Sequence, residues 1–347
     1  MLEVAHLTTV FDLPGGQTVP AVNDVSFDVR SGETLGLVGE SGSGKSVTAL
    51  SIMRLIEAPG RIASGSIRFK GRELLTLSEA DMRAIRGVEV SLIFQEPMTA
   101  LNPVFTIGNQ IAEALLVHGR TSRRTARARA IELLEAVRIP NAGRIVDDYP
   151  HQLSGGMRQR ALIAVALACT PALVIADEPT TALDVTIQAE ILDLLREMKS
   201  AFGLSLLLIT HDLGVVAETA DRVAVMYAGR IVEHGPVRAV LRDPQHPYTR
   251  GLLASMPGGV RGARLRGIDG SVPLLGALPP GCAFHPRCPD RFDPCATAPP
   301  PDYPVGPDHD ARCYLHEKIV RLKPDATFGP DATGAPDATG EGGDAAR

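Results

Sequence analysis

The chain has 347 residues, of which 44% are hydrophobic and 22% charged, and its formal net charge is −5. This length exceeds one ordinary core and favours a large domain followed by a smaller one. From Pro324 onward five acidic residues stand against Arg347, so the rest of the chain is nearly neutral and offers no basic footprint for nucleic acid. No apolar run approaches the roughly 18 residues that cross a bilayer. The N-terminus lacks a signal-peptide pattern, so we expect a cytoplasmic protein.

In chain order, alternating or continuous apolar runs predict strands over 2–4, 7–11, 22–30, 34–38, 66–70 and 88–95, with a helix over 46–55. A mainly helical block follows over 107–168. Apolar strands return at 172–176 and 205–210, on either side of a helix over 186–202, and a hairpin over 222–235 turns at Ala228 and Gly229. Strands that are apolar throughout and separated by helices are typical of a parallel sheet covered on both faces.

A glycine-rich segment follows the strand over 34–38. Its sequence is Gly39-Glu40-Ser41-Gly42-Ser43-Gly44-Lys45-Ser46, which matches the phosphate-loop pattern G-x-x-x-x-G-K-[ST]. Glycines let such a loop turn tightly and aim backbone N–H groups at an anion, and the following helix adds its positive dipole end. We therefore expect Gly39, Ser41, Gly42 and Gly44 to bind ATP. Lys45 would reach the β- and γ-phosphates, and the Ser46 hydroxyl would be a ligand of Mg²⁺.

Two acidic residues end the apolar strand over 172–176. In a phosphate-loop sheet the first acid holds Mg²⁺ through water, and the second can polarise a water beside the γ-phosphate. Asp177 is therefore the expected residue on the metal side, and Glu178 the expected general base. The alternative is a pair of acids that caps the next turn.

The most specific segment is Leu153-Ser154-Gly155-Gly156-Met157-Arg158-Gln159-Arg160, which resembles the signature sequence of ATP-binding cassette (ABC) ATPases. Other landmarks of that family follow in the expected order: Gln95 for the Q-loop, Thr181-Ala182-Leu183-Asp184 for the D-loop, His211 for the switch histidine, and Phe11 for the aromatic that stacks on adenine. The resemblance covers roughly residues 1–240. It implies an α/β phosphate-loop ATPase cassette with a mixed sheet core, an antiparallel β subdomain and a helical subdomain at about 96–168.

The resemblance also implies roles for these residues. Gln95 would be a ligand of Mg²⁺ and, with His211, part of the catalytic group around Glu178. Ser154, Gly155 and Gly156 open a helix, so their N–H groups and the serine hydroxyl form a second anion site. One chain has no evident way to close this site over its own phosphate loop. In the family two cassettes pack head to tail, each signature caps the ATP of its partner, and Asp184 lies beside the nucleotide. We expect a heterodimer with a second ABC ATPase subunit, and pairing with a second copy of this chain remains the alternative.

Three further segments resemble the cassette subunits of oligopeptide/dipeptide importers, a group that also includes nickel importers. They are residues 95–103, 246–250 and 281–289. The resemblance implies an ATPase that powers peptide import from the cytoplasmic face of the membrane. Its partners would be two transmembrane permease subunits and an extracytoplasmic peptide-binding protein, with no nucleic acid. Two alternatives remain open, a nickel importer and an ABC ATPase that acts on DNA or ribosomes.

The expected domains are a cassette over 1–245, a C-terminal extension with a small cysteine-rich domain over 246–323, and a disordered acidic tail over 324–347. Cys282, Cys288, Cys295 and Cys313 lie in the extension. Disulfides are disfavoured in a reducing cytoplasm, and the paired C-x₂₋₄-C spacing of a zinc site is absent. Some members of the importer group carry a [4Fe-4S] cluster on such cysteines, so the resemblance favours a cluster with a structural role. Zinc, free thiols and a redox enzyme that uses the cluster remain alternatives.

Overall fold

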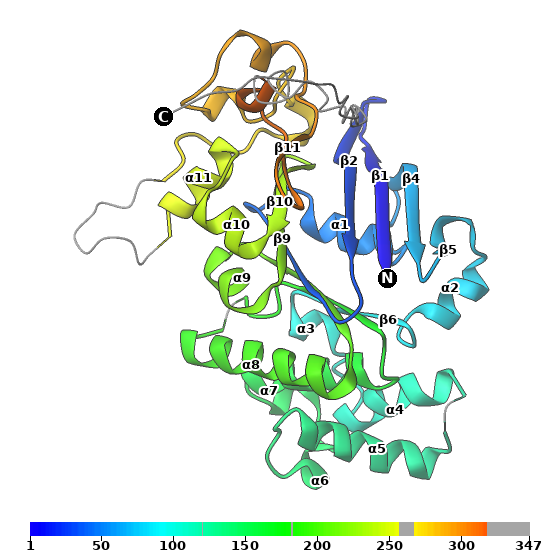
Figure 1. The fold of residues 1–347 in the computed structure, drawn as a ribbon. Coiled ribbons are helices and arrows are strands. Elements are labelled where there is room, and N and C mark those ends of the chain that lie inside the picture. The colour runs from blue at the N-terminus through cyan, green and yellow to red at the C-terminus, as the bar shows by residue number, and fades with distance from the viewer. Residues whose placement is uncertain (120, 182, 257–266, 318–347) are drawn as a thin grey trace, which may run out of the picture.

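The computed structural model describes residues 1–119, 121–181, 183–256 and 267–317. The predicted tail over 324–347 lies outside these residues, as does Ala182 of the D-loop segment. Within the described part of the chain, no helix is both long and apolar enough to cross a membrane. Figure 1 shows two sheets with a group of helices below them.

The first sheet is antiparallel and has the strand order β2-β1-β4-β5. Its strands are β1 (Leu2–Asp12), β2 (Thr18–Val29), β4 (Gly60–Phe69) and β5 (Arg72–Glu73). The two short strands predicted over 2–4 and 7–11 are one strand, because a register shift between Val4 and Leu7 absorbs the interruption and His6 takes a left-handed φ of 52°. This sheet is the predicted antiparallel β subdomain.

The second sheet is mixed and has the order β11-β12-β10-β9-β3-β8-β7-β6. Its strands are β3 (Thr34–Val38), β6 (Val90–Ile93), β7 (Leu173–Asp177), β8 (Ser205–Thr210), β9 (Arg222–Tyr227), β10 (Arg230–Pro236), β11 (Tyr303–Gly306) and β12 (His309–Ala311). The strands from β6 to β9 pair in parallel, and those from β9 to β11 pair antiparallel. The predicted hairpin at Ala228 and Gly229 joins β9 to β10. The carboxyl ends of β3 and β7 therefore lie at the same edge of the sheet, with β8 between the two strands.

Eleven α-helices lie in the described residues: α1 (Lys45–Ile52), α2 (Glu79–Ile85), α3 (Pro97–Ala100), α4 (Ile107–Val117), α5 (Arg123–Ala136), α6 (Ala142–Ile145), α7 (Gly155–Leu167), α8 (Val185–Phe202), α9 (Leu213–Thr219), α10 (Val237–Arg242) and α11 (Pro247–Ala254). Short 3₁₀ helices are η1 (Leu74–Thr76), η2 (Pro150–Gln152), η3 (Leu275–Ala277), η4 (His285–Arg287), η5 (Asp293–Ala296) and η6 (Tyr314–His316). The helical block predicted over 107–168 corresponds to α4, α5, α6 and α7.

The mixed sheet has a core on each face. Along β7, Leu173 and Ile175 enter the core between the two sheets, which also contains α1, whereas Val174 and Ala176 enter the core of the helical subdomain. Strands covered on both sides must be apolar at every position. This explains why β7 and β8 show continuous apolar runs in the sequence.

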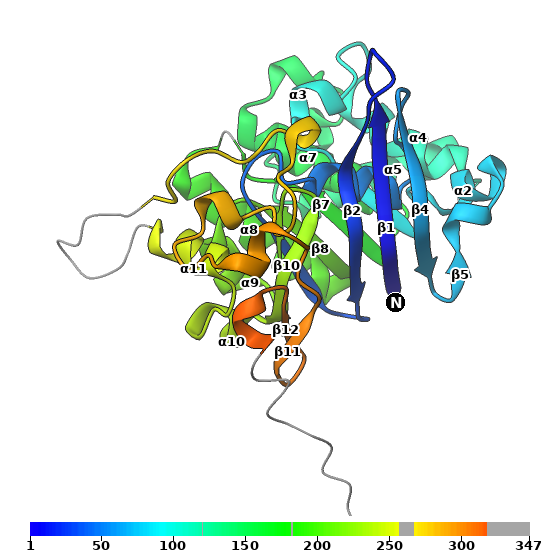
Figure 2. The same cartoon turned by 90° about the horizontal axis from the view of Figure 1, so that it is seen from above.

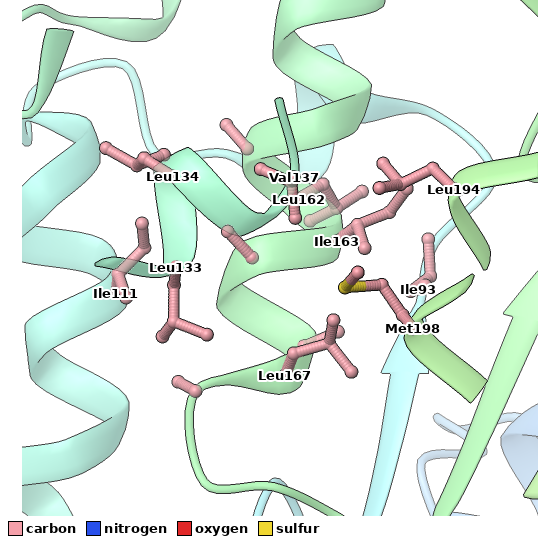
Figure 3. Close-up of a cluster of buried hydrophobic side chains, with 14 of the residues drawn as sticks. Ile93, Ile111, Leu133, Leu134, Val137, Leu162, Ile163, Leu167, Leu194 and Met198 are labelled. Carbon is pink, nitrogen blue, oxygen red and sulfur yellow. The ribbon is translucent and has the colours of Figure 1, made fainter. Parts of the chain in front are cut away.

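The core of the helical subdomain joins α4, α5, α7 and α8 to β6. Figure 3 shows Ile111 and Leu133 facing α7, with Leu162, Ile163 and Leu167 on that helix, while Leu194 and Met198 of α8 lie near Ile93. Truncating one such buried leucine to alanine costs about 2–5 kcal/mol. This packing fixes α7, whose first turn carries the signature segment.

The C-terminal segment adds to the cassette. Strand β12 pairs with β10 and β11 with β12, so the mixed sheet continues into this segment (Figure 2). Phe284 is buried in a third core with Tyr227 of β9 and Tyr248 of α11. The structure therefore does not support a separate cysteine-rich domain. A short segment rich in proline has too few apolar residues for its own core, so it shares the core of the cassette.

Candidate active site

The phosphate loop runs from the end of β3 to the start of α1, and two of its glycines have no substitute. Gly44 has a φ of +104°, and a Cβ atom there would lie 2.5 Å from the carbonyl oxygen of Ala21. A Cβ at Gly39 would lie 2.1 Å from the carbonyl oxygen of Met226. Strand β9 and the first residues of β2 thus leave room only for a glycine backbone. The phosphate loop packs against β2 and β9 on one side, and its other side lines a pocket.

Lys45 is buried and is oriented by the loop itself. Its ammonium donates hydrogen bonds to the carbonyl oxygens of Gly39 at 2.8 Å and Glu40 at 3.1 Å. Burial lowers the pKa of Lys45, and the neighbouring carboxylates of Glu178, Asp177 and Glu40 oppose that shift. A buried ammonium that keeps its charge can donate charge-assisted hydrogen bonds to an anion such as a phosphate.

A pocket of about 260 Å³ opens in front of the loop. Its lining residues are Ala21, Ser41, Gly42, Ser43, Gly44, Lys45, Ser46, Val47, Gln95 and Glu178. The structure thus brings together the Q-loop glutamine, the expected general base and the predicted phosphate-loop residues except Gly39, which does not line the pocket. They come from three segments that follow β3, β6 and β7 at one edge of the mixed sheet.

Glu178 is held by three side chains. Its Oε2 atom accepts hydrogen bonds from the Gln95 amide at 3.2 Å and the Thr181 hydroxyl at 2.7 Å, and it lies 3.3 Å from Nδ1 of His211. Its backbone φ is 45°, in the left-handed region that residues other than glycine seldom adopt. Strained backbone of this kind gathers at functional sites, where the surroundings hold it in place. Thr181 belongs to the D-loop segment, but its contact with Glu178 has no sequence signal.

Asp177 and Ser46 have the chemistry that a magnesium site needs. Burial raises the pKa of Asp177, and a hydrogen bond from Ser46 opposes the shift. The Oδ1 atom of Asp177 is buried and has no hydrogen-bond partner among the described residues. A buried carboxylate oxygen without a partner is costly unless a cation or water completes it. Carboxylate and hydroxyl oxygens suit Mg²⁺, which keeps several waters of its own.

Ser154, Gly155, Gly156 and Asp184 do not line this pocket. Ser154 caps α7 by accepting a hydrogen bond from the Met157 N–H at 3.3 Å, and Asp184 caps α8 in the same way through the Ile187 N–H at 3.0 Å. The capping role of Asp184 had not been predicted, although an aspartate before an amphipathic run is an ordinary helix-start signal.

Phe11 is also absent from the lining residues of the pocket. It lies near the end of β1, paired with Val19 and Gly60. Its predicted contact with adenine stays a prediction.

The four cysteines of the C-terminal segment share one small cavity. Cys282, Cys288, Cys295 and Cys313 line a space of about 10 Å³, room for roughly one water. All four are free thiols, and burial raises the pKa of Cys288 to about 11 and that of Cys313 to about 12. Among the described residues, no group of three or more His, Cys, Asp or Glu side chains is arranged to hold a metal ion. The prediction of a [4Fe-4S] cluster is therefore not confirmed.

Two family models match the chain. The model described as ABC transporter matches residues 22–181, and the model described as oligopeptide/dipeptide transporter, C-terminal region, matches residues 232–295. The first match contains the phosphate loop and Glu178. The second contains α11 and three of the four clustered cysteines.

Known proteins are similar over nearly the whole chain. A protein of Brucella melitensis biotype 1, provisionally named as a peptide import ATP-binding protein, is 55% identical over 92% of this chain and 98% of its own. The oligopeptide transport ATP-binding protein AppD of Bacillus subtilis is 52% identical over 92% of this chain and 97% of its own. The solved dimer of the cassette MJ0796 bound to ADP and Pi is 28% identical with a TM-score of 0.62, and covers 69% of this chain and 99% of its own. The chain therefore belongs to the ATP-binding subunits of ABC peptide transporters.

Proposed function

We propose that this chain powers the import of oligopeptides or dipeptides by hydrolysing ATP between two facing cassettes. The observation that carries the proposal is the incomplete site. The phosphate loop, Gln95 and Glu178 share one pocket, whereas Ser154 lies outside it and caps the N-terminus of α7. The first N–H groups of a helix have no partner within the helix. A helix N-terminus of this kind attracts phosphate. A second cassette supplies the missing half, and the dimeric state reported for MJ0796 supports this arrangement.

In the proposed reaction, the loop backbone and Lys45 hold the triphosphate. Glu178, oriented by Gln95, Thr181 and His211, takes a proton from the water that attacks the γ-phosphate. His211 is exposed, so it is free to contact the phosphate from the open side of the pocket. Mg²⁺ held by Ser46 and Asp177, with Gln95 nearby, would offset the charge of the phosphates. Phe11 and Asp184 would complete the nucleotide site in the assembled dimer.

The partners belong to the same proposal. The relatives carry peptide import or oligopeptide transport names, so this chain would act at the cytoplasmic face of the membrane with two permease subunits and a peptide-binding protein. The second cassette would be a related ATPase subunit. A hollow of about 420 Å³ between α4 and α5 supports docking, because Phe105 at its rim and the neighbouring Val104 are exposed apolar side chains. Exposed apolar surface beside a hollow is typical of an interaction site.

Transport assays test the proposal. The chain, its partner cassette, the permeases and the binding protein would be reconstituted in vesicles and supplied with labelled peptides or nickel. We expect ATP-dependent peptide uptake that disappears with Glu178→Gln. ATP hydrolysis without uptake of any peptide would contradict the proposal, and uptake of nickel alone would establish the alternative cargo.

The [4Fe-4S] cluster stays a separate proposal, supported only by the shared cavity of the four thiols. Protein purified without oxygen would absorb near 400 nm, and Cys313→Ser would remove that absorption. Colourless wild-type protein free of iron would end the proposal. No step of the ATPase reaction above depends on this group.

A further inference from the structure

An arginine of the C-terminal segment reaches the phosphate loop. The guanidinium of Arg287 donates from its two terminal nitrogens to the two carboxylate oxygens of Glu40, at 3.0 and 3.3 Å. The Arg287 side chain is only 7% exposed. Glu40 is the second residue of the loop, immediately after Gly39. A two-pronged contact between a planar guanidinium and a carboxylate fixes direction as well as distance.

Contacts with residues other than Glu40 also hold the Arg287 side chain in place. Its Nε atom donates to the carbonyl oxygen of Asp269 at 2.9 Å, and a terminal nitrogen donates to that of Ile268 at 3.3 Å. The guanidinium carbon also lies 5.8 Å from the centre of the Tyr227 ring. These contacts orient the guanidinium, so little side-chain freedom remains to be lost when it binds Glu40.

A second contact holds the backbone of the same residue. The N–H of Glu40 donates to the hydroxyl oxygen of Tyr248 at 2.9 Å. Tyr248 is fully buried and packs against Tyr227 and Phe284, with ring centres 4.6 and 5.4 Å away. Two residues of the C-terminal part of the chain thus hold Glu40: Arg287 binds its carboxylate and Tyr248 binds its backbone N–H.

Glu40 also connects to the ATP-binding lysine. Its carbonyl oxygen accepts a hydrogen bond from Lys45, and its carboxylate interacts electrostatically with the Lys45 ammonium. A carboxylate beside a triphosphate repels it unless another charge neutralises it. Lys45 is the lysine expected to bind the phosphates, whereas Arg287 forms an ion pair with Glu40.

We propose that Arg287 is a positioning residue for ATP binding: it neutralises Glu40 and fixes the start of the phosphate loop without touching the nucleotide. The C-terminal segment is then part of the ATP site. This inference needs only ATP binding by the full chain and does not depend on which solute is transported.

The test measures the Kd of a fluorescent ATP analogue with Mg²⁺ for the full-length chain. Arg287→Ala should raise the Kd about tenfold, the change that 1.4 kcal/mol of lost binding free energy produces. Arg287→Lys should recover part of the loss. The double variant with Arg287→Ala and Glu40→Gln should have a lower Kd than Arg287→Ala alone, because the uncompensated carboxylate is removed. A purely structural role for Arg287 would not yield this recovery.

Arg312→Gln is the matched control. Arg312 also links the C-terminal segment to the cassette, through Asp24 at 3.3 Å, and Asp24 belongs to β2 and not to the phosphate loop. Its loss should leave the Kd unchanged. If Arg287→Ala does not fold, Glu40→Arg keeps the test open, since two facing cations should weaken ATP binding at least as much. A Kd within twofold of wild type for Arg287→Ala or Glu40→Arg, or a double variant no tighter than Arg287→Ala, would overturn the proposal.

Discussion

The ammonium of Lys45 lies 3.9 Å from the Oε1 atom of Glu178. Lys45 begins the helix after β3 and Glu178 follows β7, with β8 between these strands. A γ-phosphate bound by Lys45 is therefore placed beside the carboxylate that we assign as general base. We therefore expect different effects from the two residues. Loss of the Lys45 ammonium should weaken nucleotide binding, whereas loss of the Glu178 carboxylate should slow hydrolysis.

Replacing Glu178 with glutamine should leave ATP binding intact and lower the rate of hydrolysis by about 10²–10⁴-fold, the usual contribution of a general base. The amide keeps hydrogen-bonding capacity but takes no proton. Steady-state phosphate release and gel filtration with ATP measure both effects, and we expect ATP-dependent dimers to persist. Glu197→Gln on α8 is the control, since Glu197 pairs with Arg138 at the surface. Turnover of Glu178→Gln near wild type would refute the assignment of the base.

Lys45→Ala should weaken nucleotide binding. Hydrogen bonds to charged groups contribute about 1.5–3 kcal/mol, so the Kd for ATP should rise roughly ten- to a hundredfold. Titration with a fluorescent ATP analogue measures this change. Lys70→Ala serves as the comparison, because Lys70 lies beyond β4 and pairs with Glu89 away from the pocket. Equal Kd values for Lys45→Ala and wild type would contradict the role of the lysine.

Ser154→Ala separates helix capping from the proposed role across the dimer. Loss of an N-cap hydroxyl costs about 1 kcal/mol of stability. Ser122 caps α5 through the Thr125 N–H, so Ser122→Ala provides the same loss outside the signature segment. Both variants should unfold at slightly lower urea concentration. Only Ser154→Ala should lower ATP-dependent dimerisation and turnover, and equal activity of the two variants would argue against an ATP contact by the signature.

His246 should make stability depend on pH. Burial lowers its pKa from 6.5 to about 4, so the folded chain binds fewer protons than the unfolded chain between these values. The stabilisation is complete above pH 6.5 and is lost as pH falls toward 4, by about 1.4 kcal/mol per pH unit. The measurement is the urea midpoint at pH 7, 6 and 5.

His246→Asn provides the control for this dependence. The Nδ1 atom of His246 caps α11 by accepting a hydrogen bond from the Tyr248 N–H, and asparagine offers an acceptor there without titrating. The variant should lose much less stability between pH 7 and 5 than wild type. Parallel pH profiles for the two proteins would show that other groups cause the dependence.

Much of the site could be predicted from short segments. The phosphate loop needs glycine where the backbone takes a positive φ or passes close to β9, so its pattern is visible in the sequence before any fold is known. The acids after β7 follow the same logic, since two carboxylates directly after a buried apolar strand are typical of the metal and base positions beside a phosphate loop. Strand lengths were less certain: β1 continues through an irregularity at His6 that looks like a break in the sequence.

Other relationships had no local signal. Gln95 and His211, which follow β6 and β8, meet one oxygen of Glu178, and this depends on the order of β6, β7 and β8 in the sheet. The resemblance to the importer group suggested a cluster on the four cysteines, whereas the size of their shared cavity depends on how Phe284 and its neighbours pack.

The sequence by itself determined that this chain binds ATP and in what order its nucleotide motifs occur, because each motif is a contiguous segment whose chemistry is local. Only the tertiary structure decided that the cysteine segment continues the cassette sheet and that Arg287 meets Glu40. Contacts between segments far apart in the chain follow from strand order and shared burial, which no single segment encodes.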